Sequence, residues 1–327
     1  MIAILLCTYN GEKNLRQQID SILNQTYKDI KLFISDDGSI DSTIDIITDY
    51  TVKYPDKVNR IQLKEIHNGA CMHFLKALQT QGIMDADYVM FSDQDDVWFE
   101  NKVERTLQTM ESISQLSDKP ILVHCDSVLV NDDLQEIAPS FTRFANMNQR
   151  KATFSHLLVQ NTVTGAAMMM NKALTEKLQK IPENCMMHDH WIALVASALG
   201  EIHFIDEPLY YYRQHESNVL GANKGGIVEE VINFWGGSKE VRRKRAEVRE
   251  QVRKNYEGMI RQAECLLSIH GEELSHKTKK ALRAYVDIPN RGPLGRVMTI
   301  LRYNITCDNW YRVVGQCSFF LRSRIIQ

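Results

Sequence analysis

The sequence lacks the features of a membrane-spanning or a secreted protein. It has no uninterrupted run of about 18 apolar residues, so we expect no spanning helix. Met1 leads directly into the apolar segment 2–7 without a basic region or a long apolar region, which predicts no signal peptide. The seven cysteines are scattered and contain no Cys-x-x-Cys pair. They indicate free thiols in a reducing cytoplasm and argue against a disulfide framework or a zinc site.

Charge is unevenly distributed along the 327 residues. Residues 1–223 carry 19 Lys and Arg against 30 Asp and Glu, whereas residues 224–327 carry 20 against 11. We therefore expect two parts, an acidic domain over 1–223 and a basic helical region over 224–327. The excess of positive charge predicts that the second part contacts something anionic, either a membrane surface or a nucleic acid.

Strands and helices are predicted to alternate in the first part. Short apolar runs predict strands, and apolar residues at helical spacing predict helices between them. The strands are expected at 2–7, 30–34, 59–66 and 88–91, and the helices near 15–23, 41–54 and 70–79. This order predicts an α/β fold with a mostly parallel, Rossmann-like central sheet and helices on both faces. Gly-x-Gly-x-x-Gly is absent, which argues against an ordinary dinucleotide-binding site.

Polar side chains follow these strands at the point where each strand ends. They are Thr8, Asn10, Asp36, Asp37, Asn68, Asp93 and Asp95. Because the carboxyl ends of parallel strands meet at one edge of a sheet, we expect these groups to lie close together. Ligands of open parallel sheets bind at this edge, so the pattern predicts a nucleotide site.

Three carboxylates, Asp93, Asp95 and Asp96, come directly after the buried strand at 88–91. Carboxylates so close together repel one another unless a cation lies between them. Mg²⁺ or Mn²⁺ fits this role, held by one or two carboxylates and by the phosphates of a bound nucleotide. The alternative is an acidic surface turn ahead of a helix, with Asp96 near the helix N-terminus.

The later segments are less regular. Helices are predicted over 101–113 and 192–199, and strands over 121–130, 163–170 and 202–205. The small residues at 165–167 either leave room for a ligand or allow close packing. Residues 240–261 alternate in charge and predict a long solvated helix. Residues 310–326 resemble a basic amphipathic helix at a membrane interface, or else a helix that packs on its own domain.

Five groups of residues, taken together and in order, resemble the motifs of family 2 glycosyltransferases with the GT-A fold. They are Thr8-Tyr9-Asn10-Gly11-Glu12, Asp36-Asp37-Gly38-Ser39-Asp41, Asn68-Gly69, Ser92-Asp93-Gln94-Asp95-Asp96-Val97-Trp98 and His188-Asp189-His190-Trp191. The resemblance covers about residues 1–220 and leaves the rest as a C-terminal helical extension. The Asp-Gln-Asp-Asp-x-Trp form is similar to bacterial rhamnosyltransferase-like members, which build cell-surface polysaccharides.

This resemblance implies transfer of a sugar from a nucleoside-diphosphate donor to a hydroxyl acceptor, with inversion at the anomeric carbon. It implies that Asp36 binds the pyrimidine N3–H, that Asp93 meets the ribose and that Asp189 is the catalytic base. It also implies that Asp95 ligates the metal, with His215 where some members supply a further ligand. The remaining expected donor contacts are Thr8, Tyr9, Asn10, Glu12, Asp37, Asn68 and Trp98.

Several of these residues have alternative roles. Asp36 and Asp37 could serve merely as caps of the helix that starts near Asp41, without a role in binding. Asp189 could likewise serve merely as the cap of the following helix. His215 could be a surface histidine, and Tyr210 to Tyr212 and Trp98 could pack in the core instead of stacking on a sugar. The start of a helix should lower the pKa of Asp189, whereas burial should raise it. The sequence does not decide between these two effects.

We therefore expect a metal-dependent, inverting hexosyltransferase, with dTDP-rhamnose as the first choice of donor. The alternatives are a transferase with a UDP-hexose donor, a nucleotidyltransferase or sugar-nucleotide phosphohydrolase, and a binding module without catalysis. The expected partners are a dTDP- or UDP-sugar and a glycan or lipid-linked glycan acceptor, without nucleic acid; a homo-oligomer is left open. We expect a cytoplasmic protein, held peripherally at the inner membrane face by its basic C-terminal helices.

Overall fold

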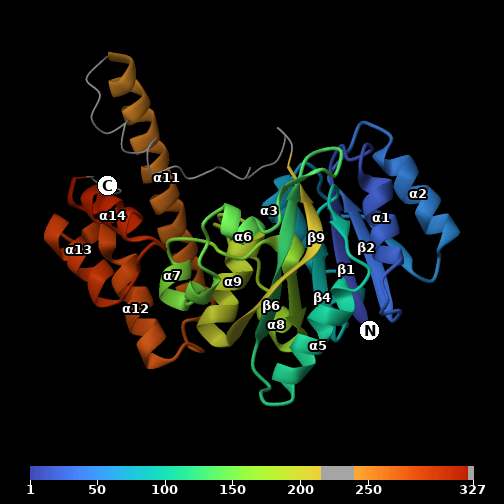
Figure 1. Ribbon diagram of the computed structural model, residues 1–327. Coiled ribbons are helices and arrows are strands. Elements are labelled where there is room, and N and C mark those ends of the chain that lie inside the picture. The colour runs from blue at the N-terminus through green and yellow to red at the C-terminus, as the bar shows by residue number, and fades with distance from the viewer. Residues whose placement is uncertain (215–238, 323–327) are drawn as a thin grey trace.

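The computed structural model describes residues 1–214 and 239–322, and residues 215–238 and 323–327 lie outside the description. A nine-stranded sheet forms the centre of the described part, and helices cover both of its faces (Figure 1). Further helices of the C-terminal region lie to one side, shown at the left of Figure 1. The predicted α/β class and the helical C-terminal extension are therefore confirmed.

The strand order is β3-β2-β1-β4-β8-β6-β9-β5, with β7 paired to β6. Parallel pairing joins the first four in this order, which are β3 (Val58–Ile61), β2 (Ile30–Asp36), β1 (Ile2–Thr8) and β4 (Tyr88–Ser92). Beyond β4 the pairing is mixed, since β8 is antiparallel to β4 and β6 whereas β9 is parallel to β6. These later strands are β5 (Val97–Trp98), β6 (Ile121–Val130), β7 (Glu136–Ala138), β8 (Met168–Asn171) and β9 (Glu201–Arg213). The parallel half was predicted, and in the mixed half the strand predicted over 121–130 matches β6.

Strand β1 is central and buried on both faces, which explains its continuous run of apolar residues. Ile2, Ile4 and Leu6 belong to the hydrophobic core on one face of the sheet. The alternate residues, including Leu5 and Cys7, belong to the core on the other face. Burying each large aliphatic side chain of this kind contributes about 1.5–3 kcal/mol.

Helices cover both faces of the sheet, because alternate side chains of β1 need an apolar partner on each face. The first face is covered by α1 (Leu15–Leu23), α2 (Thr43–Lys53) and α5 (Lys102–Ser114). The second face is covered by α3 (Gly69–Leu78), α4 (Gln81–Met84), α8 (Lys172–Lys177) and α9 (His188–Leu199). Short helical segments complete the connections: α6 (Phe141–Phe144), η1 (Gln149–Lys151), α7 (Phe154–Leu157) and η2 (Gly165–Ala167).

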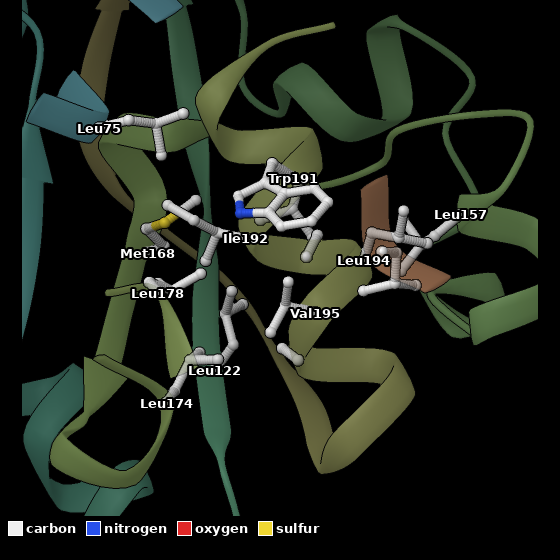
Figure 2. Close-up of a cluster of buried hydrophobic side chains, with 14 of the residues drawn as sticks. Leu75, Leu122, Leu157, Met168, Leu174, Leu178, Trp191, Ile192, Leu194 and Val195 are labelled. Carbon is white, nitrogen blue, oxygen red and sulfur yellow. The ribbon is translucent and has the colours of Figure 1, made fainter. Parts of the chain in front are cut away.

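Helix α9 is apolar on nearly all sides because it is buried between the sheet and the surrounding helices. In Figure 2 the side chains of Trp191, Ile192 and Val195 point toward residues of the sheet and of α8, among them Leu122 and Leu174. The helix ends at Leu199, beside the start of β9. Its N-terminus therefore lies at the opposite edge, where β1, β2 and β4 end.

The C-terminal helices share a hydrophobic core with the first part of the chain. They are α11 (Lys239–His270), α12 (His276–Val286), η3 (Ile288–Asn290), α13 (Pro293–Arg302) and α14 (Trp310–Arg322). Ile260 and Leu266 of α11 are fully buried in the same cluster as Trp191. Gln262 accepts a hydrogen bond from the backbone of Met186 (2.9 Å). Among the described residues, no helix combines the length and apolar character needed to cross a membrane.

Four predicted elements differ from the structure. The strand expected over 59–66 ends at Ile61. The strand expected over 163–170 begins at Met168, because residues 165–167 turn as a 3₁₀ helix. The strand expected over 202–205 extends to Arg213, past a register shift near Pro208 that lets this residue fit the sheet. The predicted solvated helix over 240–261 continues to His270, and two of its residues, Tyr256 and Ile260, are buried in the core.

Candidate active site

The loops after β1 and β2 are joined by bonds between side chains and backbone. The backbone amide of Asn10 donates to Ser39 Oγ (2.8 Å). Glu12 Oε2 accepts from the amide of Ser42 (2.9 Å), directly ahead of α2. Asn10 and Glu12 therefore help to fix the shape of the two loops. Tyr9, in the loop after β1, has a half-exposed side chain that is accessible to a ligand.

Asp36, at the end of β2, organises the second loop. Its Oδ2 accepts hydrogen bonds from the amides of Gly38 (2.9 Å) and Ser39 (2.8 Å). Its Oδ1 accepts from the hydroxyls of Ser39 (2.5 Å) and Thr8 (2.9 Å). A carboxylate has about four lone-pair sites, and here each oxygen already accepts two bonds. A pyrimidine N3–H could bind Asp36 only if one of these bonds were released, so that role stays a prediction.

Asp37 caps a helix, but not the helix that was considered for it. Its carboxylate is buried and accepts from the amides of Asn68 (3.0 Å) and Gly69 (2.9 Å), at the start of α3. Helix α2 is instead preceded by Asp41, which accepts from the amide of Thr43 (3.0 Å). Asp37 and Asn68 are therefore brought together, as predicted, and their contact joins the ends of two segments at the same edge of the sheet.

Two of the three carboxylates after β4, Asp93 and Asp96, lie in an environment that favours their neutral forms. Partial burial, together with the charges of Asp95 and Asp189, raises the pKa of Asp93 to about 7. Burial also raises the pKa of the fully buried Asp96 well above its ordinary value. Asp96 accepts one hydrogen bond through Oδ1, from the amide of Arg213 (3.3 Å), and its Oδ2 has no partner. The alternative of a solvated surface turn is therefore wrong.

A buried cation, Lys102 of α5, lies beneath this acidic loop. Its ammonium donates to the carbonyl of Ala166 (2.6 Å) and lies 3.7 Å from the ring centroid of Trp98 and 4.1 Å from that of Tyr210. Burial lowers the pKa of Lys102 to about 8, although the charge of Asp96 opposes this effect. Trp98 is 3% exposed, so the structure favours its role in the core over stacking on a sugar.

Arg213 and Gln94 hold the acidic loop in place. Arg213 Nε donates to the carbonyl of Asp95 (2.8 Å), and its Nη2 donates to Gln17 Oε1 (2.8 Å). Gln94 pairs with the backbone of Tyr9 in both directions, accepting at 2.8 Å and donating at 3.1 Å. The loop that carries the carboxylates is therefore fixed to β9, to α1 and to the loop after β1.

Asp189 lies in the first turn of α9, at the edge of the sheet where β4 ends. Its side chain is 8% exposed, and its Oδ1 accepts from the amide of His190 (2.6 Å). Burial raises the pKa of Asp189 to about 7, against opposing hydrogen bonds from His190, Gly165 and Asn161. Of the two opposed effects considered from the sequence, burial is the stronger. Asp189 is not the N-cap, since Met187 occupies that position.

The small residues at 165–167 allow close packing beside Asp189. A side chain on Gly165 would come within 2.7 Å of His188 Nε2. The ring of His188 is buried and stacks on Phe74 with a centroid distance of 4.1 Å. Of the two roles considered for this segment, the structure therefore shows packing against the helix that carries the catalytic-base candidate.

The acidic loop fits a divalent cation whose other ligands come from a substrate. The described residues contain no group of three or more His, Cys, Asp or Glu side chains that could hold a metal ion. The charge of Asp95 nevertheless raises the pKa of Asp93, as expected of neighbouring oxygen ligands that lack a cation between them. Mg²⁺ and Mn²⁺ commonly take one or two carboxylates and complete their shell with phosphates and water. His215, the second predicted ligand, lies outside the described residues.

Comparison with known proteins identifies the family. The sequence model of "Glycosyl transferase family 2" matches residues 3–178. The chain belongs to this family. A relative, the dTDP-rhamnosyl transferase RfbG of Shigella flexneri, is 27% identical over 220 residues, which are 67% of this chain and 74% of that protein. A second relative of this glycosyltransferase is the UDP-Glc:alpha-D-GlcNAc-diphosphoundecaprenol beta-1,3-glucosyltransferase WfaP of Escherichia coli. The two are 30% identical over 113 residues, which are 34% of this chain and 42% of that protein.

The fold of this glycosyltransferase is similar to that of a solved structure. TarS 1-349 of S. aureus, in complex with UDP, superposes with a TM-score of 0.52 over 93% of this chain and 91% of that chain. The sequence identity is 13%, so the likeness concerns the fold alone. The GT-A fold with a C-terminal helical region, expected from the sequence motifs, is thereby confirmed.

Two residues that shape this site were missed in the sequence, Lys102 and Arg213. Lys102 lies four and eight residues before Thr106 and Met110, both of which are buried on the inner side of α5. This helical spacing could have identified it as a buried cation. Arg213 follows three tyrosines at the end of β9, and no local pattern predicts that its guanidinium reaches Asp95.

Proposed function

We propose that this glycosyltransferase transfers a sugar from a nucleoside diphosphate to a hydroxyl of a lipid-linked glycan, with inversion. The observation that carries the proposal is the pair Asp93 and Asp189, which come from different segments and interact electrostatically at one edge of the sheet. An inverting transfer is a single displacement, which needs one base on the acceptor side. Asp189 is the candidate for this base, Asp93 would lie on the donor side, and the pKa of each is raised to about 7.

The donor in this proposal is dTDP-rhamnose, with a UDP-hexose as the second candidate. The relative named a dTDP-rhamnosyl transferase supports the first, and the relative that takes UDP-Glc supports the second. The name of that second relative also specifies a diphosphoundecaprenol acceptor, which supports a lipid-linked glycan as the acceptor here. The product in this proposal is part of a cell-surface polysaccharide.

Asp189 acts as the base in this mechanism. Its carboxylate accepts the proton of the acceptor hydroxyl while the hydroxyl oxygen attacks the anomeric carbon. The bond from that carbon to the diphosphate breaks on the opposite face, and the nucleoside diphosphate leaves with both bonding electrons. A base poised near the working pH contributes about 10²–10⁴-fold to such a step. Burial raises the pKa of Asp189 and so brings it close to the working pH.

Asp95 would hold the divalent cation together with the diphosphate oxygens, and His215 is the proposed further ligand. When bound there, the cation offsets the negative charge that grows on the leaving diphosphate. Asp93 would bind the ribose beside it, and the half-exposed ring of Tyr9 would lie along the base. Arg213 keeps the carbonyl of Asp95 fixed at 2.8 Å and so positions the loop before the donor binds.

The test is donor consumption with and without an acceptor. We expect release of dTDP from dTDP-rhamnose in the presence of Mn²⁺ and an undecaprenyl-diphosphate glycan, and an inverted anomeric centre in the product. Release of nucleotide at the same rate without acceptor would indicate a phosphohydrolase instead. Faster turnover of UDP-glucose than of dTDP-rhamnose would assign the second donor.

A further inference from the structure

Helices α13 and α14 each carry a stripe of apolar side chains that faces away from the protein. Of the 13 large apolar side chains exposed in the described residues, six lie on these two helices, with exposures between 43 and 79%. On α13 they are spaced by four and three residues, and on α14 by four and seven, which places each set on one face of its helix. They are Leu294, Met298, Leu301, Trp310, Val314 and Leu321.

The opposite faces of the same helices are anchored in the core. Ile300 of α13 and Phe320 of α14 are fully buried in the larger hydrophobic cluster. Phe320 also packs edge-on against Tyr256 of α11, with a centroid distance of 4.8 Å. The two helices therefore cannot rotate to bury their exposed stripes without losing this packing. In Figure 1 both helices lie at the far side of the molecule from α1 and α2.

The exposed charged side chains of α13 and α14 are all positive. Between residues 292 and 322 the sequence has one acidic residue, Asp308. Asp308 is buried, with its carboxylate 2.9 Å from His156 Nε2, so it does not contribute to the outer face. Arg302 and Arg322 are exposed and form no ion pair with any described residue. The face thus combines apolar side chains with unpaired arginines.

We propose that this face of α13 and α14 binds the surface of an anionic phospholipid bilayer. Apolar side chains enter the boundary of the acyl region while arginines meet lipid phosphates, as in other amphipathic helices that lie on membranes. The proposal rests on the proposed function, because a lipid-linked acceptor would lie in the same membrane. It adds the surface and the residues that bring the enzyme to that acceptor.

A second copy of the chain is a poorer occupant for this face. In a two-fold symmetric contact each patch meets its own copy, so Arg302 and Arg322 would meet arginines. No exposed acidic side chain between residues 292 and 322 could pair with them. Charge complementarity therefore favours phosphate-bearing lipids over self-association.

The test is co-sedimentation of the full chain with vesicles, without donor or acceptor. We expect binding to vesicles of phosphatidylglycerol and phosphatidylcholine, weakening as salt is added, and little binding to phosphatidylcholine alone. The double variant Leu294→Glu with Trp310→Glu should bind the anionic vesicles at least about tenfold more weakly. The control is Leu116→Glu, which places the same charge on an exposed leucine after α5 and should bind like the parent.

The proposal fails if the parent does not bind anionic vesicles, or if the double variant binds them as well as the parent does. It also fails if light scattering shows a parent dimer that the double variant dissociates, because the face would then be an interface between copies. A second variant, Arg302→Gln with Arg322→Gln, should reduce the salt dependence of binding while leaving the core unchanged. Transfer to a soluble acceptor, measured separately, should be equal in all of these variants, which distinguishes failure of membrane binding from failure of the proposed function.

Discussion

Replacing Asp189 with Asn should stabilise the protein and abolish sugar transfer. The carboxyl is 8% exposed, and burial raises its pKa from 3.8 to about 7. Between these values the folded protein holds a proton that the unfolded chain has released. The free energy of unfolding of the parent therefore falls as pH rises from about 4 to about 7, and it levels off above that. Asn is similar in size and does not titrate, so the free energy of unfolding of the variant does not fall over this pH range.

The magnitude follows from the shift. A change from 3.8 to about 7 is about three pH units, and each unit corresponds to about 1.4 kcal/mol. The full effect is about 4 kcal/mol, and the part that falls between pH 5 and pH 8 is about 2–3 kcal/mol. Loss of a hydrogen bond by the new amide would lower the stability of the variant by about 1 kcal/mol at both pH values. The difference between the two pH values is therefore the quantity to measure.

Urea unfolding of parent and variant at pH 5 and pH 8 provides the assay. We expect Asp189→Asn to gain about 2–3 kcal/mol relative to the parent between pH 5 and pH 8. Asp45→Asn is the matched control, because Asp45 lies in the first turn of α2 as Asp189 does in α9, but is exposed. A variant whose stability relative to the parent is the same at both pH values would refute the assignment of a buried, proton-holding carboxyl.

Three further outcomes follow from the geometry of the site. The rate of transfer in the parent should rise with pH through about 7, because Asp189 must be unprotonated to accept a proton; a flat profile between pH 5 and pH 8 would contradict its role as base. Lys102→Met should cost about 1–3 kcal/mol in urea unfolding, because it leaves the buried carbonyl of Ala166 without its donor. Lys53→Met, at an exposed lysine over a tyrosine, should change stability by less than about 0.5 kcal/mol. Gly165→Ala should cost about 1–3 kcal/mol and slow transfer, because the new methyl group meets a buried histidine ring at 2.7 Å. Gly315→Ala, in open space on α14, should neither destabilise the protein nor slow transfer. Equal effects of the two changes would contradict the packing argument.

The sequence predicted the parallel half of the sheet because the relevant pattern is local. β1 is apolar throughout since both of its faces are buried, and each of its neighbours ends in a polar residue at the same edge. The contact of Asp37 with Asn68, and that of Thr8 with Asp36, follow from this shared edge. In the mixed half the apolar run over 121–130 predicted β6, but the bounds of β8 and β9 were not predicted, because they depend on tertiary pairing and on register shifts.

The roles of individual side chains were harder to predict, because they depend on contacts between distant segments. Asp36 is near the predicted site, yet its four accepted hydrogen bonds are visible only once the loops are placed. Whether the helix start or burial determines the pKa of Asp189 depends on how α9 is enclosed. Arg213 reaches Asp95 across 118 positions of sequence, and no local signal reports such a contact.

The C-terminal region shows a similar division. Its helices and its positive charge were evident in the sequence. The alternative of a last helix that packs on its own domain is confirmed for one side of that helix, and the membrane interface stays a prediction. Phe320 packs on the rest of the protein, whereas Trp310 and Val314 of the same helix remain exposed. An amphipathic pattern shows that a helix has two faces, but it does not show which of them the protein itself covers.

The most direct test of the central claim is calorimetric titration of dTDP into the parent and into Asp95→Asn, with and without Mn²⁺. We predict that Mn²⁺ strengthens binding to the parent, and that Asp95→Asn loses at least about tenfold in affinity, or about 1.4 kcal/mol, only when Mn²⁺ is present. Asp118→Asn, at an exposed carboxylate just before β6, should bind like the parent. If Asp95→Asn binds dTDP with the same Mn²⁺-dependent affinity as the parent, the cation and the diphosphate are not held at the end of β4.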